Sequence, residues 1–274
     1  MRLHYSLATA LMLTAAPTLA EGGSGGNFFD GKHVLGIGAA YQEADAEVRA
    51  SVASLPEVGL DLDDLGMEDS DTSWAIEYRW RFAERWVLSG MAYTFDESGQ
   101  RTANRDFNFD GNEYSAGAVI DTELGLDTYI VNLLYQVYKG DSTELLLGGG
   151  LHAFDLDTSI EGRAFVGDLN GASGASSSEL LAPLPNLRAQ AFFTFSDRWS
   201  GSLSLGWLSA NYGDYDGSFI YAHPRLAYQL GEHWAATLGY QYVNIDLTQE
   251  KSSRRELALD ATFTGPTVYL HYRF

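Results

Sequence analysis

The chain ends Thr267-Val268-Tyr269-Leu270-His271-Tyr272-Arg273-Phe274, with a regular alternation of side-chain character. Successive side chains of a β-strand point to opposite faces, so this stretch has one apolar face and one polar face. The apolar face carries Val268, Leu270, Tyr272 and Phe274, and the other face carries Thr267, Tyr269, His271 and Arg273. The first face suits lipid and the second suits water, so the stretch predicts the last strand of a membrane-spanning β-barrel.

The start of the chain has the features of a secretory signal. Arg2 precedes an apolar run over residues 7–16, and small residues lead to Ala20 just before the acidic Glu21. We therefore predict a Sec-type signal peptide at residues 1–20, with cleavage after Ala20. No later stretch offers the roughly 20 uninterrupted apolar residues that a spanning helix needs, so membrane insertion must use strands.

The composition fits a single β-barrel domain. The chain contains 29 Gly, 16 Tyr, 14 Phe and 6 Trp residues and no cysteine, which suits a protein whose apolar surface is spread over alternating positions. Strand and turn signals recur evenly to the end of the chain, with no linker between compact halves. We predict a flexible N-terminal segment at residues 21–31 and an outer-membrane β-barrel domain at residues 32–274.

Period-two alternation divides this domain into about ten strands of membrane-spanning length. The predicted strands are residues 32–42, 73–82, 86–96, 127–138, 144–155, 185–195, 199–210, 218–230, 233–246 and 265–274. Tight turns at residues 83–85, 139–141, 196–198 and 231–232 alternate with long loops at residues 43–72, 97–126, 156–184, 211–217 and 247–264. This asymmetry predicts an all-β, antiparallel, up-and-down barrel with short periplasmic turns and long extracellular loops. Eight or twelve strands are alternatives, because residues 102–109 and 114–120 could extend neighbouring strands.

Aromatic residues gather near the predicted tight turns. They are Trp80, Phe82, Trp86, Phe195, Trp199, Trp234, Tyr272 and Phe274. Amphipathic rings prefer the boundary between lipid and water, so we expect these residues to form a girdle on the periplasmic side.

The polar faces of the predicted strands point into the barrel and carry the candidate lumen residues. These are Glu77, Arg79, Arg81, Arg188, His223, Arg225, His271 and Arg273. Side chains fill most of the interior of a barrel of this size, so the charged groups must pair, hydrogen-bond or stay hydrated. Two interpretations follow: a polar plug whose groups satisfy one another, or a cationic constriction that selects anions in a narrow pore. Further inward acids, such as Asp155 or Asp246, could neutralise the cluster.

The formal net charge of −20 lies mostly outside the predicted wall. The first long loop is acidic from Glu43 to Asp71 and contains Arg49 as its single base. Nucleic acid is excluded as a partner of this rim, because phosphate binding needs cations. The rim is compatible with divalent ions that bridge to lipopolysaccharide, with repulsion of anions from the mouth, or with a loop that is simply well solvated.

One stretch has the spacing of a metal site. Asp106, Asn108 and Asp110 alternate before Gly111, as in the first half of a calcium loop. Gly117 stands at the twelfth position, where a bidentate Glu would be expected. A two-residue turn at Asp110-Gly111 explains the same residues without a metal. We therefore predict no metal and no cofactor, with this stretch as the only calcium candidate.

Catalytic groups near the strand ends do not complete a known constellation. His152, Asp155 and Asp157 lie close together in sequence, and Asp214 and Asp216 border a later turn. The omptin proteases, which also use a ten-stranded barrel, set an aspartate pair against an Asp-x-His pair, and the second pair here lacks its His. Lipid A deacylases use His-x-Ser, and no His in this chain has Ser two positions later. We predict that the protein is not an enzyme, because acid-base and nucleophilic catalysis need a base in reach of its partner.

Several stretches resemble a group of small proteobacterial outer-membrane barrels of about this length. They are Leu60-Asp61-Leu62-Asp63-Asp64-Leu65-Gly66 before Trp80-Arg81-Phe82, then Leu184-Pro185, and the run from Gly265-Pro266 to Arg273-Phe274. The resemblance implies the barrel fold and assigns no functional site. The general architecture is similar to OmpA-type and opacity-type barrels, which implies a structural, adhesive or weakly conducting role.

The resemblance also gives the last strand a role, because the barrel-assembly machinery reads a C-terminal strand of this kind. The assembly signal would be Val268, Leu270, Tyr272 and Phe274. We therefore expect an integral protein of the outer membrane, in contact with its lipids and lipopolysaccharide, that acts in envelope structure or as a narrow pore. The alternative is a surface adhesion or ligand-binding barrel that acts through its acidic loops.

Overall fold

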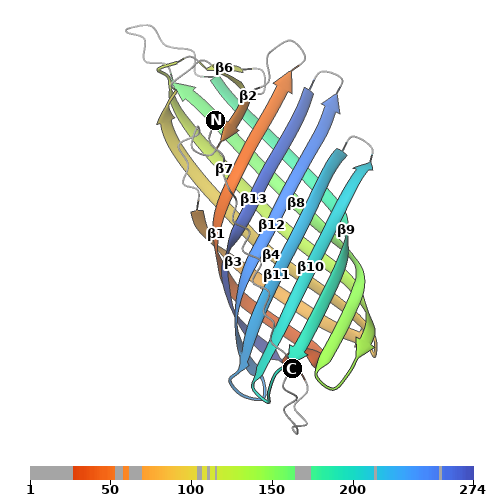
Figure 1. Cartoon of the computed structure of the whole chain (residues 1–274). Helices are drawn as coiled ribbons and strands as arrows, with labels where there is room; N and C mark the ends of the chain where they lie inside the picture. The colour runs from red at the N-terminus through yellow and green to blue at the C-terminus, as the bar shows by residue number, and fades with distance from the viewer. Residues whose placement is uncertain are drawn as a thin grey trace, which may run out of the picture.

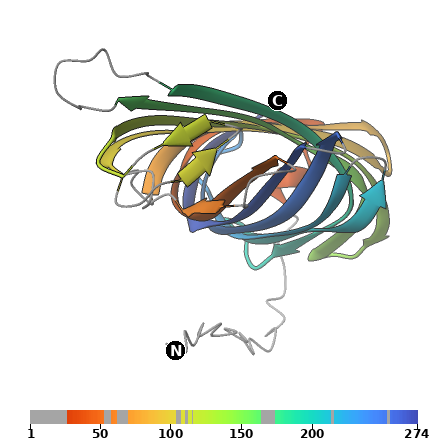
Figure 2. The ribbon, with the colours of Figure 1, turned by 90° about the horizontal axis from the view of Figure 1, so that it is seen from above.

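A closed antiparallel barrel of ten long strands forms the protein in the computed structural model (Figure 1). The structure describes residues 27–52, 58–61, 70–103, 107–109, 112–114, 116–163, 174–212, 215–252 and 255–274. The long strands are β1 (His33–Val52), β3 (Ser70–Ala83), β4 (Trp86–Thr102), β7 (Val119–Lys139), β8 (Thr143–Arg163), β9 (Gly174–Thr194), β10 (Trp199–Tyr212), β11 (Tyr215–Gln229), β12 (Trp234–Ser252) and β13 (Arg255–Arg273). Each pairs with its neighbours in chain order, and β13 pairs with β1 to close the ring seen from above in Figure 2.

Three short strands and one short helix complete the described structure. β2 (Val58–Asp61) pairs with the far end of β1, and β5 (Phe107–Phe109) pairs with β6 (Asn112–Tyr114) as a separate hairpin. The helix is a single 3-10 turn, η1 (Phe28–Asp30). No helix among the described residues is long and apolar enough to cross a membrane.

The tight turns confirm the predicted connectivity. They join β3 to β4, β7 to β8, β9 to β10 and β11 to β12, and each spans two to four residues between the strand bounds. They lie at the end of the barrel where the chain terminates (Figure 1), which we call the turn end. The opposite end is called the loop end. The predicted architecture and the preferred strand number are therefore correct.

A belt of exposed apolar side chains surrounds the half of the barrel near the turn end. Its members include Trp74, Ile76, Tyr78, Val131, Leu133, Leu187, Leu205, Trp207, Leu238, Val268 and Leu270. At the turn end the predicted aromatic girdle is present as a series of ring contacts, for example between Trp86 and Tyr135 and between Trp234 and Tyr272. Such a belt with aromatic rings at its border is the surface that a bilayer requires.

The polarity of the inward and outward faces is exchanged toward the loop end, although the same alternate residues stay inside. On β12, Leu238 and Tyr240 are exposed on the outside while Thr237 and Gln241 are buried inside. Further along the same strand Val243, Ile245 and Leu247 are the buried residues, and Asp246 is exposed. β7 changes in the same way, from Val131 outside and Asn132 inside to Glu123 outside and Ile120 inside. The barrel therefore has a lipid-facing half and a half with an apolar core of its own.

This inversion corrects the predicted strand lengths. The stretches at residues 97–126, 156–184 and 247–264 are strand over much of their length rather than loop, so that β7, for example, begins at Val119 instead of residue 127. The sequence prediction ended each strand where outward apolar residues stopped. The hydrogen-bond ladder continues beyond that point, because the same inward face goes on being buried and there carries apolar side chains. The alternative for the second long loop is wrong: β4 ends at Thr102, β7 begins at Val119, and β5 and β6 pair with each other in a separate sheet instead of extending these strands.

The apolar core of the loop-end half gives a direct test of this inversion. Ile245 is fully buried, so Ile245→Ala should lower the free energy of unfolding by about 2–5 kcal/mol. Leu238→Ala on the same strand is the matched control, because that side chain is 62% exposed and faces outward. Urea unfolding in lipid vesicles measures both variants. A loss for Ile245→Ala no greater than the loss for Leu238→Ala would show that the loop-end half is not packed.

Candidate functional site

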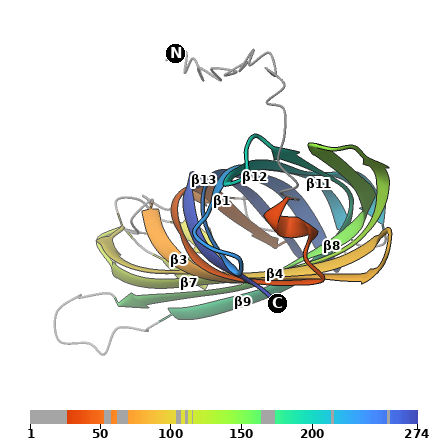
Figure 3. The same ribbon diagram turned by 90° about the horizontal axis from the view of Figure 1, so that it is seen from below.

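The interior near the turn end holds the candidate site, and η1 lies across it (Figure 3). Asn27 caps this helix, since its side-chain oxygen accepts a hydrogen bond from the Phe29 N–H at 3.0 Å. Phe28 and Phe29 are only 2% and 3% exposed. The segment predicted to be flexible at residues 21–31 is therefore, over its described part, a short helix buried in the barrel mouth. Apolar burial of two aromatic rings explains this difference.

Tilted and edge-to-face ring contacts and cationic side chains hold η1 in place. The Phe29 ring lies 5.5 Å from Phe192 and 5.2 Å from His271, between centroids. The guanidinium of Arg225 lies 5.8 Å from the Phe29 ring. Arg79 donates a hydrogen bond from Nε to the Phe29 carbonyl oxygen at 3.1 Å. The helix is thus joined to four different strands of the wall, β3, β9, β11 and β13.

Arg273 adds a further contact at the mouth. Its guanidinium lies 5.1 Å from the Phe28 ring and donates to the Phe28 carbonyl at 3.5 Å and to the Glu232 carbonyl at 2.7 Å. Among the described residues its hydrogen-bond partners are backbone oxygens. Arg273 therefore connects η1 to the turn between β11 and β12.

A first ion-pair cluster surrounds Glu144. Its carboxylate lies 2.5 Å from Arg81 Nη2 and 3.8 Å from Arg79 Nη2. Asp30 of η1 pairs with Arg81 at 3.2 Å and with Lys139 at 2.6 Å. Sequence reasoning missed Glu144, Asp30 and Lys139. Glu144 could have been predicted from the sequence, because this residue shares the inward phase of β8 with His152.

A second cluster surrounds Glu77. Arg225 Nη1 donates to both carboxylate oxygens, at 3.0 and 2.9 Å. His271 Nε2 lies 2.5 Å from Glu77 Oε1, and its Nδ1 lies 3.0 Å from Thr237 Oγ1. Gly36 of β1 lies between Glu77 and His271, where a Cβ would stand 2.7 Å from atoms of both. The glycine makes room for this contact.

His223 completes the predicted set of histidines. Its Nδ1 lies 3.0 Å from the Tyr221 hydroxyl and its Nε2 lies 2.9 Å from Thr267 Oγ1. It is fully buried. Its role in the geometry is to join β11 to β13 over the strand β12 that lies between them.

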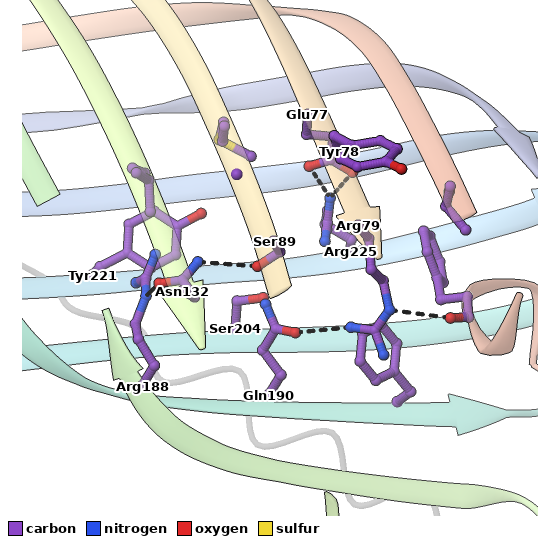
Figure 4. Close-up of a pocket in the computed structure, with 16 residues that line it drawn as sticks. Glu77, Tyr78, Arg79, Ser89, Asn132, Arg188, Gln190, Ser204, Tyr221 and Arg225 are labelled. Atoms are coloured by element: carbon purple, nitrogen blue, oxygen red, sulfur yellow. Dashed lines mark hydrogen bonds and ion pairs between the residues drawn. The ribbon is translucent and has the colours of Figure 1, made fainter. Parts of the chain in front are cut away.

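Arg188 is the one predicted lumen arginine with neither a carboxylate nor a backbone oxygen as partner among the described residues. Its Nε donates to Asn132 Oδ1 at 2.7 Å, and its guanidinium lies 4.4 Å from the Tyr221 ring. Asn132 in turn donates to Ser89 at 3.2 Å, as Figure 4 shows. A cavity of about 50 Å³ lies between this group and the Glu77 cluster.

The structure therefore brings all eight predicted lumen residues into the interior near the turn end. Three of the arginines, Arg79, Arg81 and Arg225, form ion pairs. Asp155 and Asp246, expected as further neutralising acids, do not join them. Asp246 is exposed outside, and Asp155 has the outward phase of β8 together with Leu151. The outward face carries polar side chains toward the loop end, which explains this correction.

Apolar and aromatic side chains occupy the interior beyond the charged clusters. Phe95 lies 5.7 Å from Phe263, and His152 lies 4.5 Å from Phe219, between ring centroids. His152 is fully buried inside the barrel rather than at a rim, whereas Asp157 is exposed outside. These two residues are therefore not brought together. Asp214 lies outside the described residues, as does the side chain of Asp216.

Two further predicted sites are the C-terminal assembly strand and the calcium candidate. The proposed assembly strand pairs with both β12 and β1, and Val268, Leu270 and Phe274 point outward. Its recognition by assembly machinery stays a prediction. Of the calcium candidate, Asp106 and Asp110 lie outside the described residues. Asn108 belongs to β5, but its side chain is outside the described set.

Comparison with known proteins supports the fold alone. No protein-family model and no curated protein sequence matches the chain. Among solved structures, the outer membrane protease OmpT from Escherichia coli aligns with a TM-score of 0.57 and 10% identity, over 93% of this chain and 99% of OmpT. OprG from Pseudomonas aeruginosa aligns with a TM-score of 0.36 and 14% identity, over 89% and 97%. Ail of Yersinia pestis gives 0.26 and 13%, over 86% and 98%. The chain therefore has the closed, ten-stranded, up-and-down fold of outer-membrane β-barrels.

Proposed function

We propose that the protein is an integral outer-membrane β-barrel whose lumen is closed at rest, and that it acts in envelope structure and at the cell surface. The observation that carries this proposal is η1, which lies across the turn end with both phenylalanines buried. Ion pairs around Glu144 and Glu77 support it, because paired charges fill the space that a conducting path would need.

The surface of the barrel supports the proposed location. The apolar belt and aromatic girdle match the demands of a bilayer, and the signal-like residues 1–20 would direct export. The turn end would then face the periplasm, and the half with its own core would extend outside the cell.

Exposed carboxylates on the outer half favour a contact with lipopolysaccharide. They include Glu43, Asp45, Asp96, Glu123, Asp157, Asp246 and Asp260, which are all exposed and lie beyond the apolar belt. At this level they would face the phosphates of lipopolysaccharide, and divalent cations would have to bridge the two sets of negative charge. Because a closed lumen conducts nothing, we propose that the protein acts by surface binding through this acidic half.

A narrow anion pore is the second candidate, and Arg188 favours it. This side chain presents a buried positive charge with no carboxylate partner among the described residues. A charge of this kind in a lumen selects anions when the path is open.

Conductance in a planar lipid bilayer separates the two candidates. We expect refolded protein, shown to be folded by the shift of its gel mobility on heating, to give no reproducible channels. The physical reason is that η1 and the ion pairs block the turn end. Reproducible anion-preferring channels that weaken in Arg188→Gln would overturn the closed-lumen proposal and support the pore. Arg198→Gln is the matched control, because Arg198 is exposed in a turn.

A further inference from the structure

Glycines on the two neighbouring strands flank Arg188. It pairs with Gly148 on one neighbouring strand and with Gly206 on the other. A Cβ at Gly206 would lie 3.3 Å from Arg188 Cδ, and a Cβ at Gly150 would lie 3.0 Å from Arg188 Cγ. These contacts are tighter than side chains normally allow. Because glycine has no side chain at these positions, the guanidinium can lie against the inner surface of the barrel wall, where it lines the cavity.

The hydrogen bonds of Arg188 are incomplete within the protein. A guanidinium has five N–H donors, and the one bond that Arg188 makes to a described residue runs from Nε to Asn132. Its Nη1 is buried and has no hydrogen-bond partner in the described structure. The residue is 6% exposed, so this charge is removed from bulk water. A buried charge without a partner is costly, which calls for a counter-charge at this place.

The nearby carboxylates are already engaged. Glu77 lies on the same cavity, but its two oxygens accept bonds from Arg225, and one also meets His271. Glu144 lies next to Arg81 and Arg79. Arg79, Arg188 and Arg225 all line the cavity, with Glu77 as the single acid among its lining residues. The cavity therefore has an excess of positive charge.

We propose that this cavity binds a small inorganic anion of halide size, with Arg188 as its principal ligand. Ser89, Ser204 and Gln190 also line the space and offer uncharged hydrogen-bond donors. The cavity has a volume of about 50 Å³. A single buried water needs roughly 10–15 Å³, so the cavity holds one small ion with little water. The site is independent of whether the lumen conducts.

The test compares chloride with gluconate at constant ionic strength during urea unfolding of the refolded full chain in vesicles. For the wild type, we expect the apparent unfolding constant to fall by up to tenfold for each tenfold rise in chloride above its dissociation constant, since one ion is released on unfolding. Arg188→Gln should lose this dependence. Arg198→Gln should keep it, because it removes the same charge from an exposed turn. An equal chloride dependence in the wild type and in Arg188→Gln would overturn the proposal, as would no dependence in the wild type.

A second measurement covers the case in which Arg188→Gln fails to fold. Wild-type protein refolded and crystallised in bromide should show an anomalous-scattering peak inside the barrel, beside Arg188. The absence of this peak from well-ordered crystals would overturn the site. Conductance is measured separately, so failure of the anion site and failure of the closed lumen are distinguishable.

Discussion

Glu77→Gln is expected to lower the free energy of unfolding by about 3–5 kcal/mol, because it leaves a buried arginine without its counter-charge. Arg225 donates to both oxygens of Glu77, and the two residues lie 148 positions apart in the chain. The pair therefore ties β3 to β11 across the lumen. His271 loses its carboxylate partner in the same variant. Urea unfolding of the refolded barrel in lipid vesicles measures the change.

Two controls show whether the loss comes from the buried pair. Glu84→Gln removes the same charge from an exposed turn, and surface substitutions of this kind usually stay within about 0.5 kcal/mol. The double variant Glu77→Gln/Arg225→Gln should lose less than the sum of the single variants, because neither buried charge is then left alone. Strict additivity would mean that the two side chains do not interact in the membrane-embedded protein.

Phe29→Ala is expected to destabilise the barrel by about 3–5 kcal/mol and to open its turn end. The ring packs against Phe192 and His271, and its removal leaves a hollow beside the Arg225 guanidinium. The variant should give channels in a planar bilayer where the wild type gives none. Anion preference is expected, because arginines line the exposed path.

Phe195→Ala is the matched control for this experiment. Phe195 is exposed in the aromatic girdle rather than inside the lumen. Its replacement should leave conductance unchanged and cost much less stability. If Phe29→Ala and Phe195→Ala were both silent in the bilayer while folded by gel mobility, η1 would not be what closes the barrel.

Much of the site could be predicted because it depends on local alternation. The inward phase of Glu77, Arg79 and Arg81 follows from the exposed residues Ile76 and Tyr78 between and beside them. The pairings could not be predicted in this way. Arg81 meets Glu144, 63 positions away, because the stagger of the strands brings them to one level of the barrel. That stagger belongs to the closed ring and to no single strand.

The sequence by itself determined the barrel, its tight turns, its lipid-facing side chains and the set of inward arginines, since period-two alternation and turn residues act over a few positions. Only the tertiary structure decided three other features. It placed η1 in the mouth, where aromatic rings find partners on distant strands. It divided the arginines into paired ones and the lone Arg188. It also extended the strands beyond the lipid belt, because closure of the ring creates a second interior in which the same inward face buries apolar side chains.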